Sequence, residues 1–564
     1  MFRDDYAAEL EYLHQLTGEV AEKHPREAPL LGRDASPAVS RLLQSAAFYF
    51  ARLRQRLDDD LPEVIHPVIE SLFPSLLRPM PSATVVELRP APGLKAPFVV
   101  PAGAPFASKA IEGGSCLFRS TVDVEVRPWR LDRVELTSER RELQLGVALA
   151  PGAKIDGLPP GSALRLFLAG PSAMALGARS ALLRNSRDVV ARSKGGSGVS
   201  LLGDGSVVAP ARPLRVDEED VAALAVLRAF FAWPAFFAFV DLPNIDRALP
   251  LAHETGRFDI VVRLAEPLPR SIRLDPDTVR IHCVPALNLQ RLPNPVQSPL
   301  RGSRCTITLP REGMQVHSIG KVTLVRDDLT TREAVPFAAF FPPIVDPDGA
   351  PQILFSVERR SSVVGNDPVV SLTFQGADLA RIASAKVELL TIDGARAERL
   401  GVGDVSMSVS GSPSLVTFEN ITPVSRALPP AFDRDRLWQW FQLLKIPLQE
   451  LATREQLGAC LALANAPAWA EWPDAKPSAE RFEALVGVRT LRATTRDDAL
   501  ISIAVDVDPG GFAGLGDLDL FGETVQGVLA STLRPHEAVA LSVCDAEGAA
   551  LFGYPPVRGT REGL

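Results

Sequence analysis

Apolar residues recur every three or four positions through much of the first eighty residues, which is the spacing of one face of an α-helix. A first helix is predicted over residues 6–23, and Pro25 ends it. A second is predicted from Ser36-Pro37, a hydroxyl N-cap followed by proline at the first helical position. A third, shorter helical stretch is predicted over residues 63–77. The apolar face of the second helix consists of Val39, Leu42, Leu43, Ala46, Ala47, Phe50, Leu53 and Leu57.

The pattern changes at Ala83, where short apolar runs begin, separated by proline and glycine. Such runs are typical of β-strands. Helical inserts are expected near residues 172–190, 224–231, 433–463 and 521–532. The chain is therefore predicted to be α+β and mostly β, with an N-terminal helical segment followed by several β-rich domains with helical inserts.

A chain of 564 residues is too long for one core, which stops growing near ~250–300 residues, so about three domains are expected. The changes of pattern predict an N-terminal helical (bundle) segment over 1–82 and a β-rich domain with a helical insert over 83–245. They also predict a β domain over 246–345 and a C-terminal β-rich domain over 346–564, with its helical insert near 433–463.

Composition supports the β assignment and excludes some functions. The chain has 49 prolines, too many for a helical protein, because each one removes a hydrogen-bond donor and clashes in a helix interior. The net charge is −8, and no basic tract stands out, which argues against a nucleic-acid partner. Arginine outnumbers lysine and suits interfaces, because its planar guanidinium pairs with carboxylates and stacks on aromatic rings.

Cysteine usage and the N-terminus favour the cytoplasm. The five cysteines are widely spaced and show no CxxC or Cys/His ligand spacing, so neither a disulfide framework nor a zinc site is expected. The first residues are acidic and lack the apolar core of a signal peptide.

Residues 221–240 resemble a membrane span in their apolar content. Arg228 lies near the middle, where a charge costs ~2.5–3.5 kcal/mol on insertion scales, and Pro234 follows. The favoured interpretation is a buried helix end followed by a buried strand.

Candidate chemistry is sparse. An enzyme needs a nucleophile, a base and a stabilising group that converge, or a set of metal ligands. The seven histidines show no HxH, HExxH or HxxxH spacing. His282 and Cys283 are neighbours in an apolar strand pattern, so their side chains should point to opposite faces, and a packed core histidine is favoured over a ligand pair. No catalytic, cofactor-binding or metal-binding residue is predicted.

Two further features have alternative interpretations. The run 58–60 of three aspartates could bind a divalent cation, but a solvated break that caps the next helix is favoured, because hard-cation loops need further spaced oxygens. Trp438 and Trp440 could stack on a sugar or base, although aromatic residues at helical spacing are more often core.

A series of segments, in order along the chain, resembles one family. The opening helix at 6–13 (YAAELEYL) and the exit from the helical region at 72–82 (LFPSLLRPMPS) are similar to those of TssF, also called VasA or ImpG. TssF is a baseplate subunit of the bacterial type VI secretion system. Further matching segments are 118–124 (FRSTVDV), 227–239 (LRAFFAWPAFFAF), 283–289 (CVPALNL), 420–423 (NITP) and 511–529, which begins GF and contains LFG. The family's usual turn near 390–405 is replaced by Asp393–Arg399.

The resemblance implies a structural protein without enzyme activity or cofactor. It implies a wedge formed with a TssG-like partner and further copies of the chain, which also holds TssE-like and TssK-like proteins, surrounds the VgrG spike and supports the sheath. It also implies a cytoplasmic location, docked to the inner-membrane complex through other subunits, with no direct membrane insertion.

The helical segment is where partner contacts are expected, because its apolar stripe is wider than a small domain needs. The alternative is that these helices pack only on one another. The predicted interface residues are Leu10, Leu13, Leu42, Leu43, Phe50 and Leu53.

Two other functions remain as alternatives to the type VI assignment. One is a baseplate subunit of a phage tail or of a related contractile injection system. The other is a carbohydrate-binding or carbohydrate-active β protein, suggested by the β-rich body and by Trp438 and Trp440.

Overall fold

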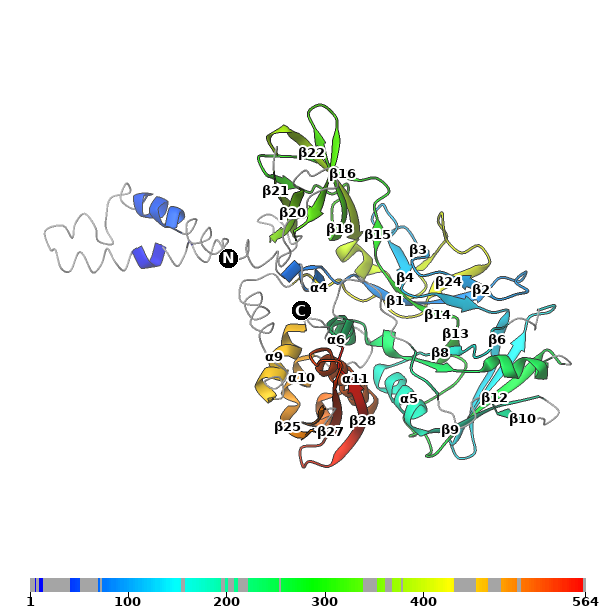
Figure 1. Cartoon of the computed structure of the whole chain (residues 1–564). Helices are drawn as coiled ribbons and strands as arrows, with labels where there is room; N and C mark the ends of the chain where they lie inside the picture. Colours follow the sequence, from blue (N-terminus) through cyan, green and yellow to red (C-terminus); the bar gives the residue numbers. More distant parts are fainter. Residues whose placement is uncertain are drawn as a thin grey trace.

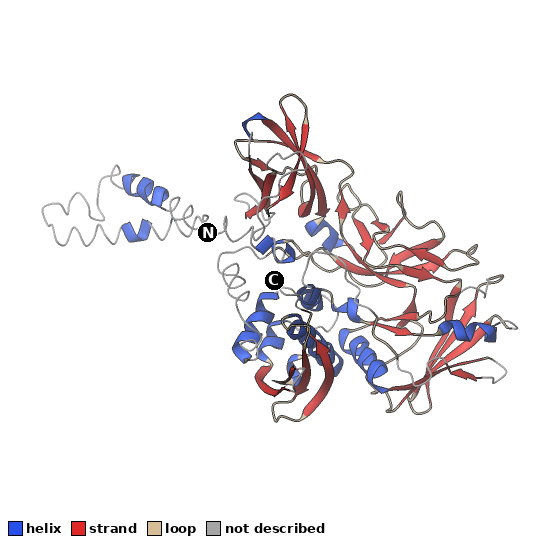
Figure 2. Cartoon of the chain, viewed as in Figure 1, coloured by secondary structure: helices blue, strands red, loops and turns tan. Residues whose placement is uncertain are grey.

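Strands dominate the computed structural model of the chain, and most of them belong to four separate sheets (Figures 1 and 2). The fold class predicted from the sequence is confirmed. The structure describes residues 6, 10–13, 41–50, 69–70, 74–153, 158–193, 198–200, 207–210, 222–252, 255–337, 352–360, 368–376, 379–430, 453–464, 478–494 and 499–560.

The central sheet combines strands from three distant parts of the chain. Its six strands run in the order β23-β3-β4-β14-β1-β24, and a two-stranded ribbon of β2 and β5 shares the same core. The strands are β1 (Ala83–Pro90), β2 (Phe98–Val100), β3 (Pro105–Ser108), β4 (Leu117–Ser120), β5 (Val124–Val126), β14 (Cys283–Leu287), β23 (Val405–Met407) and β24 (Val416–Asn420).

Asn420 joins the two end strands of this sheet. The backbone N–H of Val405 donates to Asn420 Oδ1 at 2.8 Å, and the N–H of Gly403 donates to the Asn420 carbonyl at 2.9 Å. Asn420 Nδ2 donates to the carbonyls of Gly401 and Thr422, both at 3.0 Å. The sheet therefore curls around its apolar core, and the fully buried amide has a partner for each of its polar atoms.

A second module spans residues 129–281 and contains two sheets. One has five strands in the order β10-β9-β12-β7-β6, and the other has three in the order β11-β8-β13. The strands are β6 (Trp129–Thr137), β7 (Glu142–Leu149), β8 (Leu164–Leu168), β9 (Ser186–Arg192), β10 (Gly198–Ser200), β11 (Phe239–Leu242), β12 (Arg257–Leu264) and β13 (Val279–Ile281). The helices are α5 (Ser172–Asn185), α6 (Ala222–Ala232), η1 (Pro234–Phe237) and η2 (Ile245–Ala252).

A third module, built from residues 290–392, is a single eight-stranded sheet around a separate core. Most of its strands are antiparallel, but β19 and β20 are parallel. It runs in the order β15-β22-β18-β19-β20-β21-β17, and β16 also pairs with β22. The strands are β15 (Gln290–Arg291), β16 (Val296–Pro299), β17 (Arg304–Thr306), β18 (Gln315–Arg326), β19 (Thr331–Pro336), β20 (Ile353–Arg360), β21 (Val369–Gln375) and β22 (Ile382–Ile392); η3 (Leu379–Arg381) precedes β22, and η4 (Gly394–Arg399) follows it.

Buried charges link this eight-stranded sheet to the short helix α4 (Pro74–Leu77). Arg359 on β20 donates to the carbonyls of Val316 at 2.8 Å and His317 at 2.7 Å. Burial lowers the pKa of Arg359 to about 10, while the charge of Glu70 opposes this shift and that of Arg78 adds to it. Glu70 also pairs with Arg78 at 3.6 Å, so one carboxylate from the N-terminal region faces two buried arginines.

The C-terminal module is a four-stranded sheet with α11 against it. The strands run in the order β25-β26-β27-β28, with β26 and β27 parallel, and α11 is the crossover between those two. Its elements are α9 (Arg454–Ala464), α10 (Ser478–Glu483), β25 (Leu485–Thr494), β26 (Ala499–Val507), η5 (Pro509–Gly511), α11 (Leu515–Ser531), β27 (Glu537–Cys544) and β28 (Ala550–Arg558).

The sheets cross two of the predicted domain boundaries. Strand β12, beyond residue 245, pairs with β7 and β9 before it, and β20, beyond residue 345, pairs with β19. Strand pairing is a long-range property, whereas the boundaries were placed from local changes of pattern. Two element ends also differ from expectation: α5 stops at Asn185, where β9 begins, and residues 234–237 form a 3-10 turn before β11.

The apolar run at 221–240 is a core segment, as expected. It forms α6, η1 and the start of β11, and Leu227, Phe230 and Phe236 are buried in the largest core cluster. None of the described helices combines the length and the apolar character that a membrane crossing needs.

His282 marks the point where the chain passes from one sheet to another. It lies between β13 of the three-stranded sheet and β14 of the central sheet, with φ of 57°, so the predicted continuous strand is wrong at this residue. Its Nε2 accepts a hydrogen bond from the backbone N–H of Arg127 at 3.1 Å. The side chain is buried, as predicted, and burial together with the nearby charge of Arg127 lowers the pKa of His282 to about 3.

Stability should therefore fall in acid through His282. In the unfolded chain His282 binds a proton below pH ~6.5, whereas in the folded chain it binds one only near pH 3. The free energy of unfolding is therefore unaffected by this residue above pH ~6.5 and decreases below it, by up to ~1.4 kcal/mol per pH unit. His282→Asn keeps an acceptor for Arg127 and a residue that tolerates positive φ. We expect its urea midpoint to fall less than that of the parent between about pH 7 and about pH 5. The exposed His536→Asn is the control, and an equal decline in all three proteins would contradict this role.

Candidate interaction surfaces

The predicted N-terminal interface is only partly within the described residues. Helical residues 41–50 stand apart from the sheets of the body (Figure 1). On this helix Leu42 is 71% exposed and Phe50 is 51% exposed. Leu10, Leu13 and Leu43 are half-buried, and Leu53 lies outside the described residues.

Two exposed aromatic residues were missed by the sequence analysis. Phe48 is 46% and Tyr49 is 70% exposed, and their rings meet edge to face with centroids 6.1 Å apart. The predicted stripe excluded them, because three consecutive aromatic residues cannot share one helix face at 100° per residue. That same run, Phe48-Tyr49-Phe50, is a signal that the helix is apolar on more than one side.

In the body of the protein, helices α5 and α11 are in close contact. A side chain at Gly516 would overlap the backbone of Leu176 and Gly177, so only glycine allows the two helices to approach this far. A side chain at Gly522 would likewise overlap the ring of Tyr554 on β28. Helix α11 also packs against α6, and its residues Leu518, Phe521 and Leu529 join the largest core cluster.

Charged groups on α11 are buried at this same contact. Asp519 is fully buried and accepts hydrogen bonds from Arg184 Nε at 2.9 Å, from Ser180 Oγ and from the Tyr554 hydroxyl at 3.0 Å. Burial and the carboxylate of Asp519 raise the pKa of Tyr554, which keeps its hydroxyl protonated as a donor. The buried Asp519 carboxylate therefore takes its hydrogen bonds from three protein side chains, while the Arg184 side chain stays 31% exposed.

Among the residues that the structure describes, Arg481 and Asp517 form the most deeply buried ion pair. Arg481 Nη2 lies 2.8 Å from Asp517 Oδ1 and 2.9 Å from Oδ2, and both side chains are within 1% of full burial. The guanidinium also lies 4.9 Å from the ring centroid of Phe230 on α6. This pair joins α10 to α11 and stacks both on the second module.

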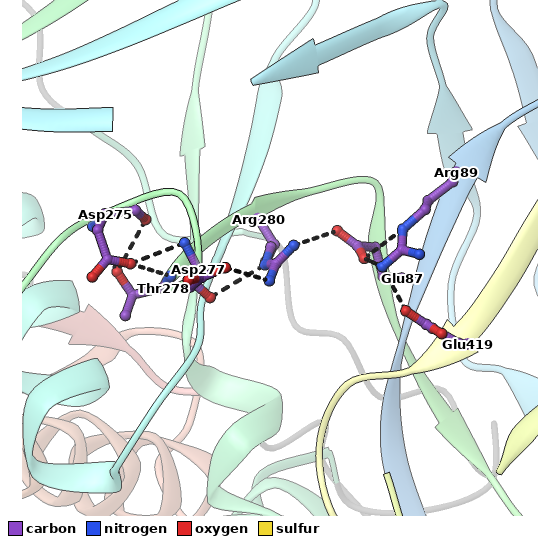
Figure 3. Close-up of polar contacts among 7 residues, drawn as sticks. All are labelled: Glu87, Arg89, Asp275, Asp277, Thr278, Arg280 and Glu419. Atoms are coloured by element: carbon purple, nitrogen blue, oxygen red, sulfur yellow. Dashed lines mark hydrogen bonds and ion pairs between the residues drawn. The ribbon is translucent and has the colours of Figure 1, made fainter. Parts of the chain in front are cut away.

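A strip of alternating charges connects the three-stranded sheet to the central sheet (Figure 3). Arg280 on β13 pairs with Asp277 at 3.3 Å and with Glu87 on β1 at 3.6 Å. Arg89 then bridges Glu87 at 2.7 Å and Glu419 on β24 at 2.5 Å. Burial alone would lower the pKa of Arg89, but the hydrogen bonds and charges of the two carboxylates outweigh it and raise the pKa. The strip is partly exposed, so it orients the two sheets more than it stabilises them.

The described residues offer little for catalysis. They contain no group of three or more His, Cys, Asp or Glu side chains that could hold a metal ion. Cys116, Cys283, Cys305 and Cys544 are free and buried, and burial raises the pKa of the Cys116 thiol to about 12. A thiol kept protonated in this way is a poor nucleophile. The aspartates at 58–60 and the tryptophans Trp438 and Trp440 lie outside the described residues.

Exposed aromatic residues gathered on one helix, as at residues 48–50, are a feature of surfaces that bind other proteins. A family model described as "Type VI secretion system, TssF" matches residues 1–561. The chain belongs to this family, which confirms the resemblance in its motifs. The match favours the type VI assignment over the phage-tail and carbohydrate alternatives.

A relative in Pseudomonas aeruginosa, the type VI secretion system component TssF1, is 29% identical over 320 residues. That alignment covers 50% of this chain and 50% of the relative, so the chain spans about half the length of the curated relative that it matches.

Two solved structures share the fold. A chain in a type VI secretion system TssK-TssF-TssG baseplate subcomplex has a TM-score of 0.73 at 22% identity, covering 93% of this chain and 99% of that one. A chain in the baseplate complex from the type VI secretion system has a TM-score of 0.62 at 19% identity, covering 99% and 100%. The agreement extends over nearly the whole chain.

Arg481→Ala should destabilise the C-terminal module by about 3–5 kcal/mol, because it leaves the Asp517 carboxylate buried without its partner. The matched control is Arg489→Ala, which breaks the exposed pair with Asp506 and should leave the urea midpoint close to that of the parent. Urea unfolding followed by circular dichroism measures both. Equal midpoints for the two variants would show that the buried pair does not hold the module.

Proposed function

We propose that the chain is a structural subunit of the type VI secretion baseplate wedge, where it assembles with a TssG-like partner to form the platform for sheath and tube assembly. The observation that carries this proposal is the family match over residues 1–561, supported by the fold shared with chains of two baseplate complexes. The role is that of a scaffold and not of an enzyme, and no cofactor takes part.

The same proposal includes the neighbours of the wedge. Further copies of the chain, TssK-like and TssE-like proteins, the VgrG spike and the sheath surround it, in the cytoplasm, and other subunits dock the assembly to the inner-membrane complex. A TssK-TssF-TssG subcomplex exists among the solved relatives, which supports the TssG-like and TssK-like partners.

The helix at 41–50 supplies the contact with partner helices in this proposal. Four of its large apolar residues, Leu42, Phe48, Tyr49 and Phe50, are between 46% and 71% exposed. Exposed apolar area in one place is unfavourable in water and marks a surface that another chain covers. The predicted set Leu10, Leu13, Leu42, Leu43, Phe50 and Leu53 is accordingly extended by Phe48 and Tyr49.

Leu42→Glu and Phe50→Glu, each made in the full chain, should reduce recovery of the TssG-like protein from co-expression by at least about tenfold, because a charge would be buried at the helix contact. Gln44→Glu is the matched control, since it places the same charge at an exposed polar position on the same helix. Affinity purification with quantification of the partner is the readout.

The thermal midpoint of the isolated protein separates binding from folding. It should be unchanged in all three variants, because the residues are exposed in the free chain. Full recovery of the partner with both Leu42→Glu and Phe50→Glu would remove this helix from the interface. If the parent chain itself recovers no TssG-like protein, the wedge proposal fails.

A further inference from the structure

Four arginine side chains gather where the central sheet meets the eight-stranded module. At this joint β15 lies against β4, and Arg399 of η4 pairs with Glu112 in the turn between β3 and β4 (Figure 1). The four arginines come from β4, from β15, from the loop between β17 and β18, and from η4. They are Arg119, Arg291, Arg311 and Arg396, and the surface that they form is named the arginine seam.

Arg311 and Arg396 border the same small space. A Cβ on Gly114, in the turn between β3 and β4, would lie 3.0 Å from Arg311 Nη1 and 3.4 Å from Arg396 Nη1. Because residue 114 is a glycine, no side chain of the turn itself separates the two guanidinium groups. The turn therefore has two positive groups beside it and an open position between them.

The other two arginines are linked to this pair through β15. Arg311 Nη2 donates to Gln290 Oε1 at 3.4 Å, and Arg291 is the next residue on the strand. Burial lowers the pKa of Arg119, and the charge of Arg291 lowers it further, so these two guanidinium groups repel each other. Like charges therefore continue along the seam from η4 to β4.

A single carboxylate among the described residues pairs with the four arginines. Asp393 Oδ1 lies 3.3 Å from Arg311 Nη2, and its other oxygen accepts a hydrogen bond from Asn288 at 2.9 Å. Arg396 has no side-chain hydrogen bond or ion pair within the described ranges, and its Nε is buried. Its two terminal nitrogens reach the surface of this half-buried side chain. An unmatched guanidinium that is partly out of water favours an anion beside it.

The positive charge of the seam contrasts with the chain as a whole, which carries a net charge of −8. An acidic ligand is therefore repelled by the molecule in general and attracted to this surface. The arginines come from four separate elements along the joint, so one small anion between Arg311 and Arg396 would leave the other two unmatched. An extended segment with several carboxylates can meet them in turn, and the planar guanidinium pairs with carboxylates through two hydrogen bonds.

We propose that the arginine seam binds an acidic segment of a partner protein, whose carboxylates pair with Arg396 and with its neighbours along the joint. One carboxylate takes the open position beside Gly114, and others reach Arg291 and Arg119. Arginine is enriched at protein interfaces and among the residues that dominate their binding energy. The inference does not depend on residues 41–50 or on the wedge proposal.

The test uses the full chain and two labelled peptides, acetylated hexaglutamate and hexaglutamine, which differ in charge and not in length. Fluorescence anisotropy should detect hexaglutamate with a Kd on the order of 0.1 mM in about 20 mM salt. Hexaglutamine should bind at least about tenfold more weakly. Raising the salt to about 200 mM should weaken hexaglutamate at least about fivefold, because the ions screen partly exposed charges.

Gly114→Asp locates the binding. Residue 114 is not in the left-handed region, and the groups nearest to a new Cβ are the ends of two flexible side chains, so a side chain can be accommodated. The added carboxylate should occupy the position between Arg311 and Arg396 and weaken hexaglutamate at least about tenfold. Gly114→Asn is the matched control, since it has the same size without the charge. The thermal midpoint should be higher for Gly114→Asp than for Gly114→Asn, because only aspartate offsets the repulsion.

Arg396→Gln tests the unmatched guanidinium itself. It should weaken hexaglutamate at least about fivefold and leave the thermal midpoint unchanged, because the described residues give this side chain no partner to lose. Arg270→Gln is the matched control. It makes the same change of net charge at an exposed position of the second module and should bind like the parent.

Several results would overturn the proposal. One is no binding of hexaglutamate up to about 10 mM, and another is equal binding of the two peptides. Parent-like affinity in both Gly114→Asp and Arg396→Gln would place the peptide elsewhere on the chain. Inorganic phosphate is the last probe: displacement of hexaglutamate at equal concentrations would show a general anion site and not a docking surface for an acidic segment.

Discussion

The contact between α5 and α11 is the constraint on which the rest of the body depends. It brings a helix near residue 175 against one near residue 520, and it works only because Gly516 presents no side chain to the backbone of Leu176 and Gly177. The carboxylate of Asp519 is fully buried there and is paired with Arg184 of α5, while the Asp517 carboxylate is fully buried against Arg481 of α10. Buried charges are costly unless they meet these partners, so the contact tolerates one arrangement of the two modules and penalises others.

That one arrangement makes three parts of the chain interdependent. The core of the second module includes Phe230 and Phe236 from the apolar run, and it continues without interruption into Phe521 and Val525 of the C-terminal module. The central sheet draws its strands from both sides of this module in sequence, and Asn420 fixes its two ends together. A scaffold subunit has to hold its binding surfaces in fixed positions relative to one another. A shared core with buried ion pairs provides the necessary rigidity.

Much of the local structure could be predicted from the sequence. The run 221–240 contains Arg228 and Pro234, which identified a core helix and strand in place of a membrane span. The helix predicted near 521–532 covers most of α11, although α11 already begins at Leu515. The family could be predicted because its motifs occur in order over the whole chain. Those motifs now have physical roles: residues 283–289 include β14 of the central sheet, Asn420 joins its end strands, and residues 511–529 contain most of α11, the helix that docks on α5.

The long-range features could not be predicted. Nothing near Arg481 in the sequence indicates that Asp517 will be its partner, and the strands that pair across residues 245 and 345 have no local mark of that pairing. His282 interrupts what reads as one strand, because the switch between sheets is decided by tertiary contacts and not by its neighbours. The exposed Phe48 and Tyr49 were missed because helical periodicity finds a single stripe, whereas this helix is apolar on several sides.

The central claim is that the docking of α11 on α5 makes the second and C-terminal modules one mechanical unit. Native-state hydrogen exchange of the full chain, resolved by peptide across residues 172–185 and 515–531, tests this most directly. The account predicts that the amides of both helices exchange at the same rate and belong to the slowest-exchanging amides of the chain. It also predicts that their exchange rates depend on added urea in the same way. Exchange of α11 at markedly lower urea than α5, with α5 still protected, would contradict it, since the C-terminal module would then open without disturbing the body.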